Sequence, residues 1–155
     1  MRSTKVEIRL KKRGIELPPA PQPVGAYVGV TRVGKLLVTS GQLPWVGEKL
    51  FLIGKVGGEL TVEQGYEAAR ICALNALAQL MTELANLDHI RQIVRLEGYV
   101  HCAPGFRDHP KVLNGASDLL NQLFGEKGRH TRTAVGIADM PLDAPVQLVV
   151  WAQEE

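Results

Sequence analysis

Arg132, near the C-terminus, is the residue whose chemistry is easiest to infer from its neighbours. It opens a run with the two-residue period of a strand, in which successive side chains point to opposite faces. One face carries Arg132, Ala134, Gly136 and Ala138, and the other carries Thr133, Val135 and Ile137. Because the residues beside the arginine are small, we expect its guanidinium to lie along a shallow floor with room for a ligand. A guanidinium there suits a carboxylate, because its fork of N–H donors can bind both oxygens.

A second strand is predicted close behind it. The loop 139–145 contains two prolines, which cannot donate hydrogen bonds to a sheet. The alternation then resumes, with Val146, Leu148 and Val150 on one face and Gln147, Val149 and Trp151 on the other. The chain therefore ends in two strands.

Length and composition are those of one ordinary folded domain. The chain has 155 residues, of which 45% are hydrophobic and 22% charged. A net charge of +2 gives no reason to expect a nucleic-acid partner. No apolar run reaches the length of a membrane span and the charged N-terminus lacks a signal pattern, so we expect a cytoplasmic protein without a membrane partner. Cys72 and Cys102 have neither disulfide nor metal-site spacing and are expected to be reduced thiols.

Residues 1–23 are predicted to be a basic N-terminal segment and a proline-rich connector, ahead of a single domain at 24–155. We favour a short helix that begins after Ser3 or Thr4 and ends at Gly14. The cations of residues 2–14, which begin with Arg2, have no aromatic residue among them to stack a base. A solvated helix face is therefore preferred to an RNA-binding patch.

A hairpin is expected between Gly25 and Gln42, with strands at 27–32 and 36–40 around a turn at Gly34. Gly41 can leave the strand with positive φ, which would turn Ser40 toward a cavity. The alternative is a strand-end serine bonded to its own backbone. A third strand is expected at 50–55, before the turn residues 57–58.

A helix, a strand and a second helix follow. Thr61 and Gln64 form a capping box that opens the longest helix. Its sheet-facing stripe is Ala69, Cys72, Ala73, Ala76, Leu77, Leu80 and Leu84.

The strand at 90–102 has one face with Val94, Leu96, Gly98 and Val100 and one with Arg95, Glu97, Tyr99 and His101. The second face is polar yet carries an aromatic, which suits contact with another subunit. The second helix carries Val112, Ala116, Leu119, Leu120, Leu123 and Phe124. This order predicts an α+β fold, one sheet packed on two helices.

Two blocks of the sequence resemble the YjgF/Rid family of reactive-intermediate deaminases, formerly named L-PSP endoribonucleases. The first block is residues 25–28 (GAYV) and 36–44 (LLVTSGQLP), and the second is residues 132–135 (RTAV) and 140–142 (MPL) with the apolar strand after them. The resemblance covers roughly Val24 to the C-terminus. It implies a fold like that of Bacillus-type chorismate mutase, a mixed sheet on two helices with the last strand in the middle. It also implies a homotrimer joined through its sheets, with ligand clefts between neighbouring subunits.

The resemblance also implies the residues of the site. Arg132 matches the arginine that binds the substrate carboxylate, and Asn114 matches an asparagine at the start of the second helix. Tyr27, Ser40 and the Gly41 after it match the first block. Structural roles are the alternatives: a surface salt bridge for Arg132, a half-buried aromatic for Tyr27 and a solvent-facing helix residue for Asn114. For Arg132 we prefer the functional interpretation, because its neighbours are small.

Gln147 departs from the family pattern, which has a glutamate that positions the water attacking an imine. An amide can orient water but cannot accept a proton as a carboxylate does. His101, His130 and Asp139 are candidates to take over that task. The sheet order decides whether Gln147 and Arg132 share a cleft, since direct pairing of the two closing strands would set Gln147 opposite Ile137, far from Arg132.

The implied activity is hydrolysis of small 2-imino or enamino acids to a 2-oxo acid and ammonia, with Arg132, Gln147 and Ser40 as the catalytic group and no cofactor. No metal site is expected, because the four histidines lack ligand spacing. The alternative, which Gln147 favours, is a small-carboxylate-binding or regulatory trimer without turnover. An endoribonuclease has the least support, because the sequence offers no recognisable His/His or His/Lys acid-base pair.

Overall fold

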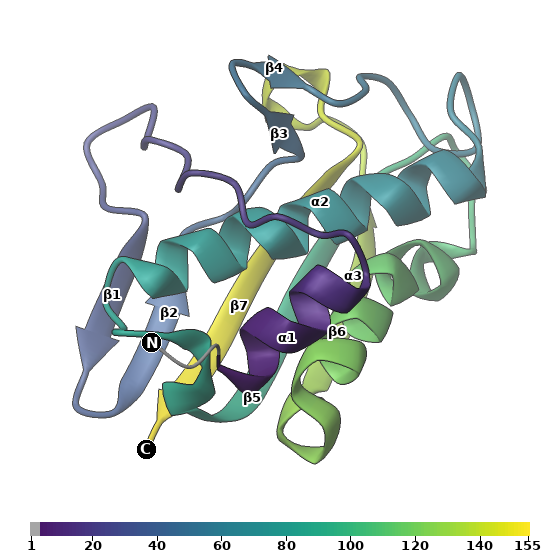
Figure 1. Cartoon of the computed structure of the whole chain (residues 1–155). Helices are drawn as coiled ribbons and strands as arrows, with labels where there is room; N and C mark the ends of the chain where they lie inside the picture. The colour runs from purple at the N-terminus through teal and green to yellow at the C-terminus, as the bar shows by residue number, and fades with distance from the viewer. Residues whose placement is uncertain (1–3) are drawn as a thin grey trace.

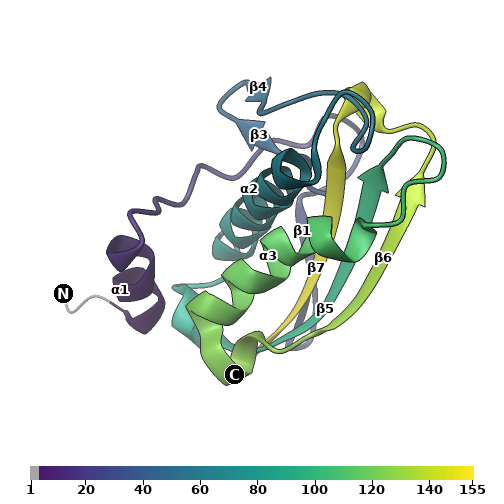
Figure 2. The ribbon, with the colours of Figure 1, turned by 90° about the vertical axis from the view of Figure 1, so that its right-hand side faces the viewer.

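The computed structural model describes residues 4–155 and shows one large sheet with the helices on a single face (Figures 1 and 2). Residues 1–3, and with them Arg2, lie outside the described range. The helices are α1 (Lys5–Lys12), α2 (Val62–Met81) and α3 (His109–Phe124). The strands are β1 (Val30–Val33), β2 (Leu36–Thr39), β3 (Trp45–Val46), β4 (Lys49–Leu50), β5 (Ile90–His101), β6 (Thr131–Ile137) and β7 (Val146–Glu154). Short 3₁₀ turns occur at Leu87–His89, Gly125–Gly128 and Pro141–Asp143.

The last strand runs through the middle of the five-stranded sheet, whose order is β1-β2-β7-β5-β6. β5 and β6 are parallel, and the other neighbours are antiparallel. The two closing strands are therefore separated by β5, and Gln147 lies opposite Tyr99 rather than Ile137. The mixed α+β fold predicted from the sequence is confirmed.

The helix-covered face forms the main core. Both hydrogen bonds of the predicted capping box at Thr61 are present, and every residue of the predicted α2 stripe is buried. α3 also packs closely on α2, because Gly115 has no Cβ to collide with the backbone of Tyr66. These two helices pack against one face of β5, β6 and β7 (Figure 2).

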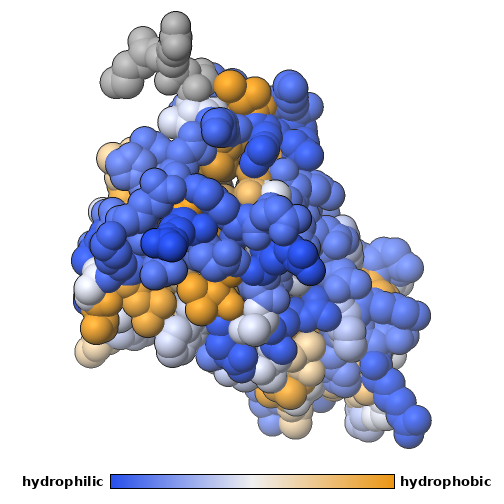
Figure 3. Space-filling model, turned by 90° about the horizontal axis from the view of Figure 1, so that it is seen from below, coloured by the Kyte–Doolittle hydropathy of each residue, from blue (hydrophilic) through white to orange (hydrophobic). Residues whose placement is uncertain are grey.

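The N-terminal helix is capped at one end and packed against the rest of the core. The Thr4 side chain and Glu7 form a capping box, and the Asp88 carboxylate accepts hydrogen bonds from the backbone amides of Lys5 (2.7 Å) and Val6 (3.0 Å). Val6 and Leu10 belong to the same core as the sheet. The short helix predicted in this part of the sequence is confirmed. The surface of the molecule seen from below is mainly hydrophilic, with separate hydrophobic patches (Figure 3).

Three local predictions are wrong. Residues 51–55 form no strand; instead β3 and β4 make a small hairpin around Gly47, whose φ is +62°. The first strand begins at Val30 and not at residue 27. Val94 is only half-buried, because register shifts in β5 bring Ile93 into the core instead.

Among the helices of residues 4–155, none combines the length and the apolar composition needed to cross a membrane.

Candidate functional site

Four of the predicted site residues line one hollow of about 450 Å³, here called the Gln147 hollow. It lies beyond the end of β2, between the proline-rich connector and the loop that precedes β7. Its lining consists of Pro21, Gln22, Pro23, Val24, Tyr27, Gly29, Ser40, Gly41, Gln42, Leu43, Trp45, Gln79, Pro141, Leu142 and Gln147. Tyrosine is the only titratable type among them, so no charged side chain of residues 4–155 lines the hollow.

Gly41 has a different role from the one predicted. Its φ is not positive, so no left-handed bend follows Ser40. The absence of a side chain at Gly41 leaves room for Gln147, because a Cβ at Gly41 would lie 2.7 Å from Cδ of Gln147, too close for any real contact. The glycine therefore lets the Gln147 side chain lie against the backbone at the wall of the hollow.

The Gln147 amide forms no side-chain hydrogen bond within residues 4–155, although it is half-buried. Ser40 lies nearby with its hydroxyl donated to the carbonyl of Val28. Its oxygen lone pairs remain able to accept a hydrogen bond. Gln147 and Ser40 can therefore both hold a water or a ligand.

Two buried amides that were not predicted as site residues hold this wall together. Gln42 Nε2 donates to the carbonyl of Ser40 at 3.0 Å. Gln79 of α2 donates to the carbonyl of Pro21 at 2.6 Å and also lies 3.5 Å from Gln42 Oε1. One feature of the sequence could have indicated this role: Gln79 is a polar residue within the apolar run of α2. These bonds connect the helix to the connector and to the serine.

Arg132 and Asn114 meet on the other side of the sheet. Arg132 Nη1 donates to Asn114 Oδ1 at 2.9 Å and to Ser117 Oγ at 3.1 Å, and Nη2 lies 3.4 Å from the carbonyl of Pro110. The structure thus brings together two residues that were named from the resemblance, and Asn114 does not simply face solvent. Every one of these acceptors is neutral, and no carboxylate of residues 4–155 forms an ion pair with Arg132. The guanidinium keeps a net positive charge that an anion can neutralise.

His130 extends this network. Its Nδ1 lies 2.6 Å from the carbonyl of Gly128, so that nitrogen carries the proton and Nε2 accepts from the Ser117 hydroxyl at 2.9 Å. Burial lowers the pKa of His130; the bond to Gly128 opposes this, and the charge of Arg132 lowers the pKa further. A neutral ring is what lets Ser117 give its hydroxyl hydrogen to His130 and keep its lone pairs for Arg132. A small hollow beside these groups is lined by Ser117, Asn121, Arg129, His130 and Arg132.

The predicted shallow floor beside Arg132 is not open along its whole length. At Gly136 the space is occupied by two side chains, and a Cβ there would lie 2.7 Å from Cys102 Sγ and even closer to His109. The reason is that the first turn of α3 covers this end of β6. The room for a ligand lies on the Ser117 side of the arginine instead.

The two groups of residues lie on opposite faces of the sheet within one chain. Partners across a ladder point to the same face, so Gln147 shares a face with its partner Tyr99, and Arg132 shares one with its partner Leu96. Leu96 is in the helix-covered core. Tyr99 is on the opposite face, here called the bare face because the helices lie on the other side (Figure 2), and it packs there against the small cluster of Leu43, Met140 and Ala144. Two strand spacings and three residues also separate Gln147 from Arg132, about 14 Å between Cα atoms. One chain alone does not place both side chains on one small ligand.

The other candidates for water activation do not reach the Gln147 hollow. His101 is buried, with Nε2 3.1 Å from the carbonyl of Ala138 and Nδ1 3.4 Å from Asp143 Oδ1. Asp139 is exposed and His130 belongs to the arginine network. Within the described residues, no three of the histidine, cysteine and acidic side chains form a group that could hold a metal ion.

Comparisons with known proteins agree with this fold. Residues 7–154 match the family described as YjgF/chorismate mutase-like, putative endoribonuclease. The chain is 41% identical over 147 residues to Protein TCP17 of Trypanosoma cruzi, covering 94% of this chain and 92% of that protein.

Solved structures give the same result. A putative endoribonuclease from Shewanella oneidensis MR-1 is 42% identical, with a TM-score of 0.93 over 96% of this chain and 98% of the other. The protein Atu1372 of Agrobacterium tumefaciens, of unknown function, is 39% identical, with a TM-score of 0.89 over 96% and 91%. Escherichia coli TdcF with bound serine shares the fold at 21% identity, with a TM-score of 0.61 over 88% and 94%.

The fold is thus that of the YjgF/chorismate-mutase-like class. The chain belongs to the YjgF family.

Proposed function

We propose that this protein is a Rid-like hydrolytic deaminase of small 2-imino or enamino acids, which releases a 2-oxo acid and ammonia. The observation that carries the proposal is Arg132: a half-buried guanidinium held by neutral acceptors, with its charge unpaired within residues 4–155. Such a group suits a substrate carboxylate, since the fork of N–H donors binds both oxygens.

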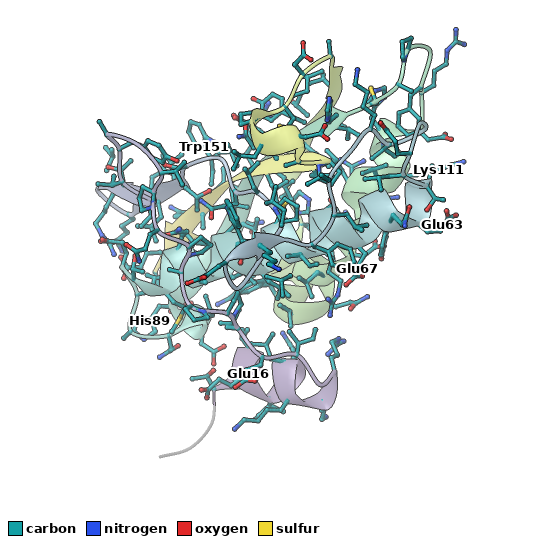
Figure 4. The ribbon with its side chains drawn as sticks, turned by 90° about the horizontal axis from the view of Figure 1, so that it is seen from above. Glu16, Glu63, Glu67, His89, Lys111 and Trp151 are labelled. Atoms are coloured by element: carbon teal, nitrogen blue, oxygen red, sulfur yellow. The ribbon has the colours of Figure 1, made fainter. Side chains whose placement is uncertain are left out.

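We further propose that the site is completed in a homotrimer, with Arg132 of one subunit and the Gln147 hollow of a neighbour facing one ligand. Three features support an association through the bare sheet face. Trp151 projects from β7 away from α1 and α2 (Figure 4), and its Nε1 is buried without a hydrogen-bond partner in residues 4–155. Val135 is 42% exposed on the same face. Arg95 and Glu97, also on this face, form an ion pair at 3.3 Å, which leaves little net charge to oppose the contact.

The reaction then proceeds in two steps. A water held by Gln147 and Ser40 adds its oxygen to the imine carbon, while the nitrogen gains a proton and the C=N bond becomes a single bond. In the resulting carbinolamine the hydroxyl proton is transferred to the nitrogen, the C–N bond breaks, a carbonyl forms and ammonia leaves. The amide orients the water but takes no proton, so proton transfer passes through solvent or the substrate nitrogen.

A second candidate is a trimer that binds small carboxylates without turnover. It is favoured by the absence of any carboxylate or histidine among the residues that line the Gln147 hollow. An endoribonuclease activity, as in the name of the Shewanella relative, has less support, because no carboxylate or histidine lines the Gln147 hollow.

The test follows 2-oxobutanoate release from enzymically generated 2-iminobutanoate. The wild-type chain should accelerate release above the buffer rate, and Arg132→Ala should reduce kcat/KM by on the order of a hundredfold, since a charge-assisted pair is lost. Arg70→Ala, which removes a half-buried arginine of α2 that pairs with Glu67 and lines neither hollow, is the matched control. A wild-type rate equal to the buffer rate, with bound 2-oxobutanoate detectable, would leave the binding function as the conclusion.

A further inference from the structure

The Gln147 hollow is larger and more apolar than the smallest 2-imino acids require. Its polar side chains are Gln22, Tyr27, Ser40, Gln42, Gln79 and Gln147. Ser40 and Gln147 come from the end of β2 and the start of β7. Seven apolar residues make up another part of the wall: Pro21, Pro23, Val24, Leu43, Trp45, Pro141 and Leu142. A cavity of about 450 Å³ with this division takes a ligand with a polar end and an apolar end.

Leu142 is placed at the hollow by a strained loop. Leu142 has φ +58° and the next residue, Asp143, has φ +57°, a left-handed conformation that residues with a Cβ rarely adopt. Its side chain is 57% exposed, so burial in the core does not explain the strain. Backbone strain of this kind persists where the surrounding contacts hold the residue in that conformation, and it is concentrated at binding sites.

The loop is held firmly in this conformation. The amide of Gly54 donates to the carbonyl of Asp143 at 2.8 Å, and the amide of Asp143 donates to that of Met140 at 3.0 Å. Met140 and Ala144 are buried in a small second core with Leu43. Leu142 is therefore presented at the edge of the hollow by an anchored backbone.

The opposite walls are equally fixed. Asn75 of α2 is 1% exposed and donates to the carbonyls of Leu43 (3.0 Å) and Trp45 (3.1 Å). Gln79, one turn further along α2, holds the carbonyl of Pro21 in the connector. One helix thus positions both the Trp45 wall and the connector wall, and the apolar part of the hollow is preformed.

We propose that this hollow selects 2-imino acids with a branched or aromatic apolar side chain over the smallest members of the class. The inference rests on the proposed function for the carboxylate and imine end of the ligand. The apolar side chain lies between Trp45 and Leu142, with the connector over it. Each additional methylene in such a pocket strengthens selection about tenfold or more.

The test measures binding of stable 2-oxo acids to the full-length protein by calorimetry. 4-Methyl-2-oxopentanoate and phenylpyruvate should bind at least about tenfold more tightly than 2-oxobutanoate. Leu142→Asn removes the apolar side chain while keeping a residue that tolerates positive φ, and should reduce the preference severalfold. Val33→Asn is the control, because Val33 is 71% exposed at the far end of β1 and does not line the hollow.

The outcomes separate the two proposals. Equal affinity for 2-oxobutanoate and 4-methyl-2-oxopentanoate, or a preference that Leu142→Asn leaves unchanged, overturns the selectivity. A clear preference without any imine turnover upholds the selectivity and overturns only the deaminase. Failure to bind any 2-oxo acid overturns both.

Discussion

Replacing Gln147 by glutamate should convert water orientation into water activation. The substitution keeps the length and shape of the side chain, which lies against Gly41 at the wall of the hollow. A general base contributes on the order of 10²–10⁴ in rate. Because the wild-type amide already orients the water, we expect a gain near the lower limit, about 10²-fold in kcat, or about 2.7 kcal/mol of activation free energy.

The same change should reduce stability. No cation of the described part of the chain, residues 4–155, lines the hollow, so a new half-buried carboxylate has no partner there. We expect the free energy of unfolding to fall by about 1–2 kcal/mol. Only the ionised carboxylate acts as a base, so the gain in rate should grow as the pH rises and disappear on acidification.

The assay is 2-oxobutanoate release from enzymically generated 2-iminobutanoate, with urea unfolding in parallel. The matched control is Gln153→Glu, which makes the same change on the same face of β7, opposite Leu36 and away from the hollow. The reasoning is refuted if Gln147→Glu binds 2-oxobutanoate as the wild type does and hydrolyses the imine no faster.

Two further predictions concern single side chains. The pKa of His130 is lowered on folding, so the unfolded chain binds the proton more readily and stability should fall as the pH drops through about 6.5. The loss of stability between pH 8 and pH 5, measured by unfolding, should be smaller in His130→Gln but not in a variant of the exposed His89. An unchanged loss in His130→Gln would contradict the assignment. For the thiols, burial raises the pKa of Cys72 well above its ordinary value, whereas Cys102 is partly exposed beside His109. A thiol reagent should therefore titrate one cysteine in the native protein and two in denaturant. Rapid labelling of the native Cys102→Ser variant would contradict this prediction, because only Cys72 remains there.

Local patterns in the sequence predicted the elements well. The capping box at Thr61 gives a helix start because its two hydrogen bonds are made within four residues. The alternation around Arg132 and Gln147 likewise assigned each side chain to one face of its own strand. Such features depend on neighbours in the chain, which the sequence shows directly.

Relations between distant segments could not be predicted in the same way. The alternation of two strands does not say which faces coincide, and this depends on β5 lying between β6 and β7. The expected positive φ at Gly41 was wrong for a similar reason, since the glycine is needed to clear Gln147, far away in sequence. The connection from Gln79 to Pro21 also joins segments that only the fold brings together.

The central claim is that Arg132 and Gln147 of different subunits face one ligand, and mixed oligomers test it most directly. Arg132→Ala and Gln147→Ala chains are refolded together in equal amounts, and bound 2-oxobutanoate is counted by calorimetry. If each cleft takes Arg132 from one chain and Gln147 from its neighbour, random mixing restores about a quarter of the wild-type sites. Mixtures that bind no more than the two parent variants would contradict the shared site.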